Sequence, residues 1–183
     1  MWIFLAGVAA ALAYGVVVFN RCIKYKTLMR EASSGIDVQL KRRHDLIPNI
    51  VATVKGYMRH EATLLENIAS LRSQLTGLTQ TSEKKGLENS LSGALKTLFA
   101  LAENYPDLKA NQSFLQLHES LVEIEDQIQL ARRYYNGTVR NYNILVESFP
   151  SNLMARVFHF APADFFELEF ATQASSPEVR FAQ

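Results

Sequence analysis

The chain opens with a long uncharged segment, and everything after it reads as helix with one apolar face. No charged residue occurs from Trp2 to Phe19, and at 1.5 Å per residue these 18 positions extend about 27 Å, close to the thickness of a bilayer's hydrocarbon core. The basic residues Arg21, Lys24, Lys26 and Arg30 follow at once. We therefore predict one transmembrane helix over residues 1–21, with the lipid bilayer as its partner.

A cleaved signal peptide is the alternative interpretation of this segment. Ala11-Leu12-Ala13 resembles a small-x-small cleavage site. However, the first residues carry no Lys or Arg, and the apolar run continues well past Ala13 to Phe19. The sequence thus favours an uncleaved anchor.

The charges flanking the anchor predict its orientation. All nearby basic residues lie on the C-terminal side of the span, and the positive-inside rule places that side in the cytoplasm. We expect a single-pass protein of a cytoplasmic (inner) membrane, with the N-terminus outside and the body in the cytoplasm.

Three long apolar seams follow the anchor, with spacings of four and three that are typical of packed helices. The first seam runs from Ile36 through Tyr57 to Leu78, and Pro48 inside it predicts a kink or break in the turn before the proline. The second runs from Leu87 to Tyr105, where Pro106 ends it. The third runs from Phe114 to Phe149, and a short amphipathic helix capped by Ser151 follows.

Each seam needs a partner, and short connections make neighbouring helices antiparallel. The fold class is therefore all-α: an N-terminal transmembrane helix, then an elongated antiparallel up-and-down helical bundle over residues 22–170. Residues 171–183, which include Ser175-Ser176-Pro177, are expected to form a flexible tail. Six phenylalanines gather toward the C-terminal end and either pack over the bundle or form an exposed contact patch: Phe149, Phe158, Phe160, Phe165, Phe166 and Phe170.

Small residues inside the anchor are candidates for helix–helix packing. Gly7, Ala11 and Gly15 follow one another at spacing four, which lets two helix backbones approach closely. Small residues are also common in any apolar segment. If the stripe is functional, the protein is a homo-oligomer.

One basic cluster, Lys41-Arg42-Arg43-His44, is a candidate partner-docking site near the Pro48 kink. Arg43 falls on the apolar seam, where a buried charge must be paired. The candidate partners are acidic residues nearby or on another helix: Asp37, Asp45, Glu103 and Asp107. The cluster is either an internal ion pair that fixes helix register or a docking surface.

The segment from Tyr105 to Asn111 is the second candidate docking site. Pro106 fixes a turn, while Asp107 and Asn111 can cap the next helix or bond loop amides. Structural capping and partner recognition both remain open.

Composition and residue spacing give little support for catalysis. The net charge of +1 does not favour nucleic acid as a partner, and the single cysteine, Cys22, excludes an internal disulfide. Cys22 is either an acylation site at the membrane boundary or a small apolar filler. The four histidines are scattered, and no metal motif, phosphate loop or nucleophile elbow occurs. We expect no enzyme activity, cofactor, metal or small-molecule substrate.

Several segments of the chain resemble the signatures of the LemA family, in the family's order. They cover nearly the whole chain after residue 24 and include Ile36–Asn49, Val54–Tyr57 with His60-Glu61, Ala102–Asn111, Ala131–Asn136, Tyr142-Asn143 and Phe149–Leu153. Residues 30–35 depart from the pattern, since the family usually has an apolar, tryptophan-bearing stretch there.

The resemblance implies a bacterial protein with an N-terminal membrane helix and a four-helix body. It implies no enzymatic activity, because the family has no agreed biochemical function; some relatives are linked to membrane organelles and others are discussed beside membrane proteases. The hypothesis is a non-enzymatic membrane-anchored scaffold that self-associates and presents a protein-interaction surface. The alternative is a regulatory adaptor of a membrane enzyme such as a membrane protease, with a membrane protein as its partner.

Overall fold

The structure is a computed structural model that describes residues 1–77 and 81–166. Every regular element in these ranges is a helix, which confirms the all-α prediction. The elements are α1 (Trp2–Lys55), the 3-10 turn η1 (Arg59–Glu61), α2 (Ala62–Gly77), α3 (Thr81–Ala102), α4 (Pro106–Lys109), α5 (Gln112–Glu147) and α6 (Ser151–Val157).

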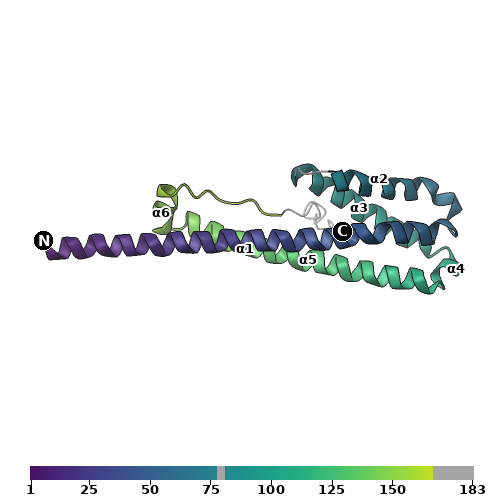
Figure 1. Cartoon of the computed structure of the whole chain (residues 1–183), viewed down its shortest axis with the longest axis horizontal. Helices are drawn as coiled ribbons and strands as arrows, with labels where there is room; N and C mark the ends of the chain where they lie inside the picture. Colours follow the sequence, from purple (N-terminus) through teal and green to yellow (C-terminus); the bar gives the residue numbers. More distant parts are fainter. Residues whose placement is uncertain (78–80, 167–183) are drawn as a thin grey trace, which may run out of the picture.

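The frame of the molecule is a pair of long antiparallel helices, α1 and α5 (Figure 1). At 1.5 Å per residue, the 54 residues of α1 form a rod of about 80 Å. The α2–α3 hairpin packs beside the C-terminal half of α1 and makes a four-helix bundle there, while α6 lies against the N-terminal half. The predicted elongated up-and-down bundle is therefore confirmed.

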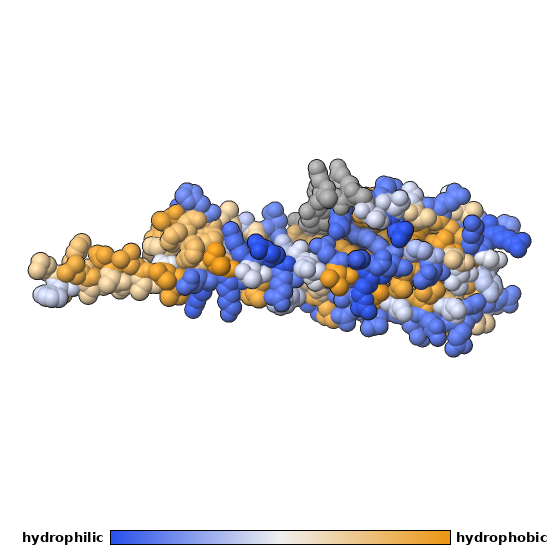
Figure 2. All heavy atoms as spheres, in the orientation of Figure 1, coloured by the Kyte–Doolittle hydropathy of each residue, from blue (hydrophilic) through white to orange (hydrophobic). Residues whose placement is uncertain are grey.

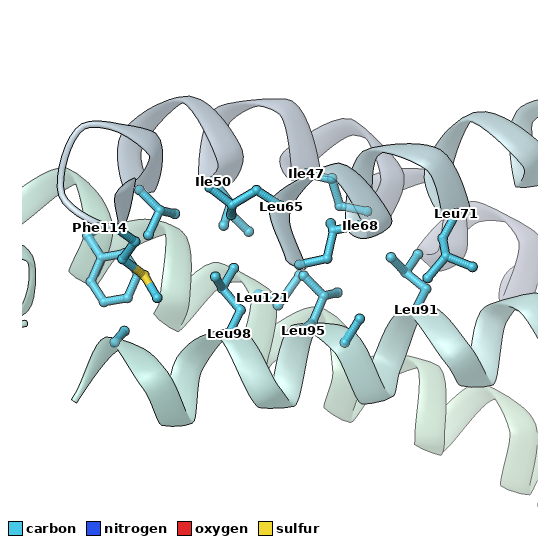
Figure 3. Packing of buried hydrophobic residues seen from close by; sticks show 14 of the residues in the cluster. Ile47, Ile50, Leu65, Ile68, Leu71, Leu91, Leu95, Leu98, Phe114 and Leu121 are labelled. Carbon is cyan, nitrogen blue, oxygen red and sulfur yellow. The ribbon is translucent and has the colours of Figure 1, made fainter. Parts of the chain in front are cut away.

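The apolar seams are the buried faces of the helices. In α1 the buried positions from Ile36 to Val54 follow the predicted spacing, and in α5 Leu121, Ile124 and Ile128 do the same. Figure 3 shows how Ile47 and Ile50 of α1 meet residues of α2 and α3, such as Ile68 and Leu98, in the core of the bundle.

Two seam positions are wrong because their helices end earlier than predicted. Tyr57 is 40% exposed and Phe149 is 79% exposed. Helix α1 ends at Lys55, and the fully buried Met58 fills the core where Tyr57 was expected. Helix α5 ends at Glu147, so Phe149 belongs to the connection to α6. Ser151 is the first residue of α6 and donates to the carbonyl of Ser148, so it does not cap the helix as predicted.

The predicted break at Pro48 is also wrong, since α1 continues through it to Lys55. A proline lacks the N–H that would bond the carbonyl four residues earlier, which here belongs to His44. Arg72 of α2 supplies the missing donor, because its Nε lies 3.1 Å from the His44 carbonyl oxygen. A tertiary contact thus satisfies the group that the proline releases, and the chain reverses only at residues 56–61.

After α6 the chain runs back along the α1–α5 pair as an extended segment, residues 160–166, which we term the strap. Two asparagines of α5 hold it. Asn143 accepts from the amide of Ala163 at 2.8 Å and donates to its carbonyl at 2.9 Å. Asn136 forms the same pair of bonds with Phe166, at 2.7 and 3.0 Å. Asn136 and Asn143 are seven residues apart on a helix, and Ala163 and Phe166 are three residues apart on an extended chain. Both separations are about 10 Å, so each asparagine lies opposite its partner in the strap.

The C-terminal phenylalanines divide between the two expected arrangements. Phe160 and Phe166 of the strap pack against buried residues of α1 and α5. Phe149, Phe158 and Phe165 are exposed. Phe170 and the predicted tail, residues 171–183, lie outside the described residues.

Replacing both strap-binding asparagines, Asn136→Ala with Asn143→Ala, should release the strap. Four hydrogen bonds at about 1 kcal/mol each are lost, so the population of the open strap should rise more than tenfold. Limited chymotrypsin digestion of the full-length protein in detergent should then cut faster after Phe160 and Phe165. Asn141→Ala, on the same helix but without a bond to the strap, is the control. Equal cleavage rates for the double variant and wild type would show that other contacts hold the strap.

Candidate functional site

The N-terminal third of α1 is an exposed apolar rod. Its large side chains are open to the surroundings, with Trp2 82% and Ile3 90% exposed, and the orange extension in Figure 2 shows this end of the molecule. Within the part of the chain that the structure describes, α1 is the one helix long and apolar enough to cross a membrane, by length and composition. Such a surface is unfavourable in water and favourable in lipid.

The inner end of this rod is covered by α6 and the strap. Met154 of α6 lies 3.3 Å from the position that a Cβ on Gly15 would take. Phe19 makes edge contacts with Phe158 and Phe160, with ring centroids 5.0 and 5.6 Å apart. The α6 region is therefore fixed to α1 within the last residues of the uncharged segment.

This packing buries one residue of the small-residue stripe in the anchor and leaves the other two exposed. Gly15 is buried by Met154 of its own chain, so it is not open to a second helix. Ala11 is exposed, and no atom lies within 4 Å of a Cβ placed on Gly7. Gly7 and Ala11 thus form the open part of the stripe.

Cys22 lies inside the protein. It is fully buried in a small core with Val18 and Tyr142, and Val146 and Ala155 complete the cluster. Its position corresponds to the apolar-filler interpretation, because a buried thiol is not open to acylation.

The bundle core contains a charged cluster centred on Arg43, whose side chain is fully buried. Its guanidinium contacts Glu88 of α3 and bonds Ser92 Oγ at 2.7 Å and a Glu125 oxygen of α5 at 3.0 Å. His44 Nε2 lies 3.0 Å from the second oxygen of Glu88. The predicted internal ion pair exists, and its acids lie on other helices, which was one of the two alternatives; they are Glu88 and Glu125 and not the examples Glu103 and Asp107.

The electrostatics of this cluster depend on its neighbours. Burial alone would raise the pKa of Glu88, but the hydrogen bond from His44 and the charge of Arg43 outweigh it, so the pKa lies below its ordinary value. Burial, followed by repulsion from Arg43, lowers the pKa of Arg132, whose guanidinium stacks on Phe166 of the strap at 4.7 Å. The cluster therefore joins α1, α3 and α5, and Arg132 connects it to the strap.

The two predicted docking sites lie apart. Lys41 and Arg42 are exposed in the C-terminal third of α1, but Arg43 is enclosed and Pro48 belongs to the continuous helix. The second group lies at the far end of the bundle, where Tyr105 precedes α4 and Pro106 and Asp107 are its first two residues (Figure 1).

The loop at this far end is ordered by capping. The Asn111 side chain accepts from the Phe114 amide at 3.1 Å and donates to the Tyr57 hydroxyl at 3.0 Å. Tyr105 donates to Glu61 at 3.4 Å. Asn111 therefore caps α5, as the structural interpretation of this segment predicted.

The outer face of α5 carries apolar side chains that sequence reasoning missed. They follow helical spacing on the side of α5 away from its buried seam, and each is 40–56% exposed: Leu115, Val122, Leu130, Tyr134 and Ile144. A shallow groove of about 380 Å³ lies among Leu130, Tyr134 and Gly137. Counting the helical period from Leu115 as well as from Phe114 could have found this face, because it is a separate apolar series on the same helix.

The part of the chain that the structure describes shows no cluster of residues suited to bind a metal ion. Within residues 1–77 and 81–166 no group of three or more His, Cys, Asp or Glu side chains could hold a metal ion. The charged residues around Arg43 pair mainly with one another, and Arg43 and Glu88 are both buried.

The sequence matches proteins of known family. The family model described as "LemA family" matches residues 32–181. Protein LemA of Metamycoplasma hominis is 32% identical over 138 residues, which are 73% of this chain and 58% of that protein. This chain thus spans somewhat more than half the length of that relative.

More distant relatives are magnetosome proteins. Magnetosome protein MamQ 2 of Paramagnetospirillum magneticum is 23% identical over 193 residues, covering 91% of this chain and 71% of that protein. Magnetosome protein MamQ of Magnetospirillum gryphiswaldense is 20% identical over 188 residues, covering 87% and 69%.

Glu88→Gln should destabilise the body by about 3 kcal/mol at pH 7, since it breaks a buried ion pair. Because the pKa of Glu88 is lowered in the folded state, its stabilising effect is present above the ordinary value of 4.5 and is lost as the pH falls through the folded value. The variant should therefore lose less stability than wild type between pH 5 and pH 3.

Thermal unfolding of the full-length protein in detergent, followed by circular dichroism, measures both effects. Glu125→Gln is the matched control: it removes the same charge, but that side chain is 38% exposed, so the cost should be about 1 kcal/mol or less. Equal losses for the two variants would contradict the central role of Glu88.

Proposed function

The chain belongs to the LemA family, and from that premise we propose that it is a non-enzymatic, membrane-anchored scaffold that self-associates and presents an interaction surface at the membrane. The observation that carries this proposal is the continuity of α1. One helix extends from the exposed apolar end, through the charged cluster, to the far end of the bundle. An anchor and a body that share one rigid helix hold the body in a defined position relative to the membrane.

Two surfaces support self-association. Gly7 and Ala11 leave the exposed part of the anchor open to close packing with a second anchor. The outer face of α5 adds apolar side chains along the body, from Leu115 to Ile144. Restricting copies to the plane of the membrane raises their effective concentration, so weak contacts of this kind suffice for assembly.

The relatives agree with a membrane-associated helical protein and give no sign of an enzyme. Neither the family's name nor the names of the magnetosome relatives describe a catalytic activity. The basic residues that follow the uncharged segment favour a cytoplasmic body in this proposal.

Gly7→Leu with Ala11→Leu should weaken self-association while the anchor still inserts, because leucine is more apolar but holds neighbouring backbones apart. Gly15 is left unchanged, since it is packed against Met154. Light scattering of the detergent-solubilised full-length protein should give a discrete multi-subunit mass for wild type and a lower mass for the variant.

Ala9→Leu with Ala13→Leu is the matched control, because these exposed alanines have the same spacing on the opposite face of the helix. Loss of mass in both double variants would mean that bulk alone disturbs assembly. A wild-type protein that is monomeric until a membrane enzyme is added would favour the adaptor alternative over the scaffold.

The orientation can be tested with Gln116→Cys, an exposed position of α5 far from the anchor. The native Cys22 is fully buried, so it should contribute little background. A membrane-impermeant maleimide should label this cysteine in broken cells but not in intact spheroplasts. Labelling of intact spheroplasts would place the body outside.

A further inference from the structure

A groove lies between α1 and α5 where the uncharged segment ends. It has a volume of about 640 Å³, within the range of small-ligand sites. The α1 side consists of one helical stripe: Tyr14, Val17, Val18, Arg21, Lys24 and Tyr25. Asn141, Ile144, Leu145 and Ser148 of α5 form the other side, and Ser151 closes one end.

The lining changes from apolar to cationic along α1. At the end within the uncharged segment the α1 wall is formed by Tyr14 and Val17, which are 38% and 48% exposed. Ile144 of α5 lies level with Arg21 and Lys24 instead, because the antiparallel register that pairs Arg43 with Glu125 sets it there. Arg21 and Lys24 lie one and two turns beyond Val17, past the end of the apolar run at Phe19. Within the described part of the chain neither has an acidic partner.

We propose that this groove binds an anionic phospholipid of the membrane in which α1 is anchored, with the phosphate between Arg21 and Lys24 and one acyl chain along Tyr14 and Val17. The order of the lining matches the order of groups in a lipid, because the headgroup and the acyl chains meet at the depth where the uncharged segment ends. Asn141, Ser148 and Tyr25 supply neutral hydrogen-bonding groups for the headgroup or glycerol oxygens.

The position of α6 makes the groove a fixed site. Met154 and Phe158 hold α6 against Gly15 and Phe19 on the other flank of α1, and the buried Val18 and Tyr142 join α1 to α5 between the two flanks. The walls are therefore set by packing that the lipid does not have to create. A lipid in the groove would fill the apolar gap beside α5 and couple the end of α5 to the bilayer. This inference depends on insertion of α1 and not on self-association.

The test uses full-length protein in nanodiscs that contain phosphatidylcholine with a minor fraction of phosphatidylglycerol. After release into detergent, native mass spectrometry counts the lipids that stay bound. Wild type should retain phosphatidylglycerol over phosphatidylcholine, and Arg21→Gln with Lys24→Gln should reduce that preference about tenfold or more.

Two further variants distinguish lipid binding in the groove from electrostatic attraction of the lipid to any nearby basic residue. Lys26→Gln with Arg30→Gln removes the same charge from residues that do not line the groove, and it should keep the preference. Val17→Trp fills the apolar end without changing charge, and it should reduce retention of phosphatidylglycerol. Circular dichroism checks that each variant is folded.

Equal retention of the two lipids by wild type would overturn the proposal. So would an equal loss in the two charge-removal variants, which would show surface attraction only, or full retention by Val17→Trp. These results would leave the particle masses of the anchor variants unaffected, so failure here is distinguishable from failure of the scaffold proposal.

Discussion

The apolar seam between α1 and α5 is the contact on which the other elements depend. It begins near the anchor with Val18, Cys22 and Tyr142, continues through Leu40 and Ile128, and ends in the bundle core near Ile47 and Leu121. Because the helices are long and antiparallel, the seam gives the molecule a single axis. The α2–α3 hairpin, α6 and the strap are each held against this pair, and the strap is also joined to α6, because the Phe160 amide donates to the Ala155 carbonyl at 2.8 Å.

A charged cluster interrupts the seam, and the free-energy cost of burying a charge explains why Arg43 has several partners. A buried guanidinium is tolerated only when it is paired and hydrogen-bonded, and Arg43 has Glu88, Glu125 and Ser92 as partners from two other helices. An apolar seam of regular spacing permits a helix to slide by one heptad, whereas these partners exist at one register only. The cluster therefore fixes how α3 and α5 are placed along α1, and Arg132 beside it stacks on Phe166 of the strap.

The membrane end has a different character from the bundle end. Here three elements share a small core, and the N-terminal end of α1 and α6 expose large apolar side chains such as Trp2, Leu153 and Val157 (Figure 2). The same rigid helix carries the lipid-facing residues and the charged cluster. Any partner or lipid that changes the position of α5 at this end would also act on the seam that orders the body, because the two helices are packed along their length.

The sequence by itself determined the helices, their buried faces and the anchor, because the period of apolar residues and the absence of charge are local properties of the chain. It also placed Arg43 on a buried face and Asn111 at a cap. Only the tertiary structure decided the rest. The partners of Arg43 lie 45 and 82 residues away, and the Arg72 side chain that lets α1 pass Pro48 comes from another helix. The roles of Asn136 and Asn143, the burial of Gly15 and the groove beside Arg21 likewise depend on segments that meet only after folding, and no periodicity along one helix can encode such meetings.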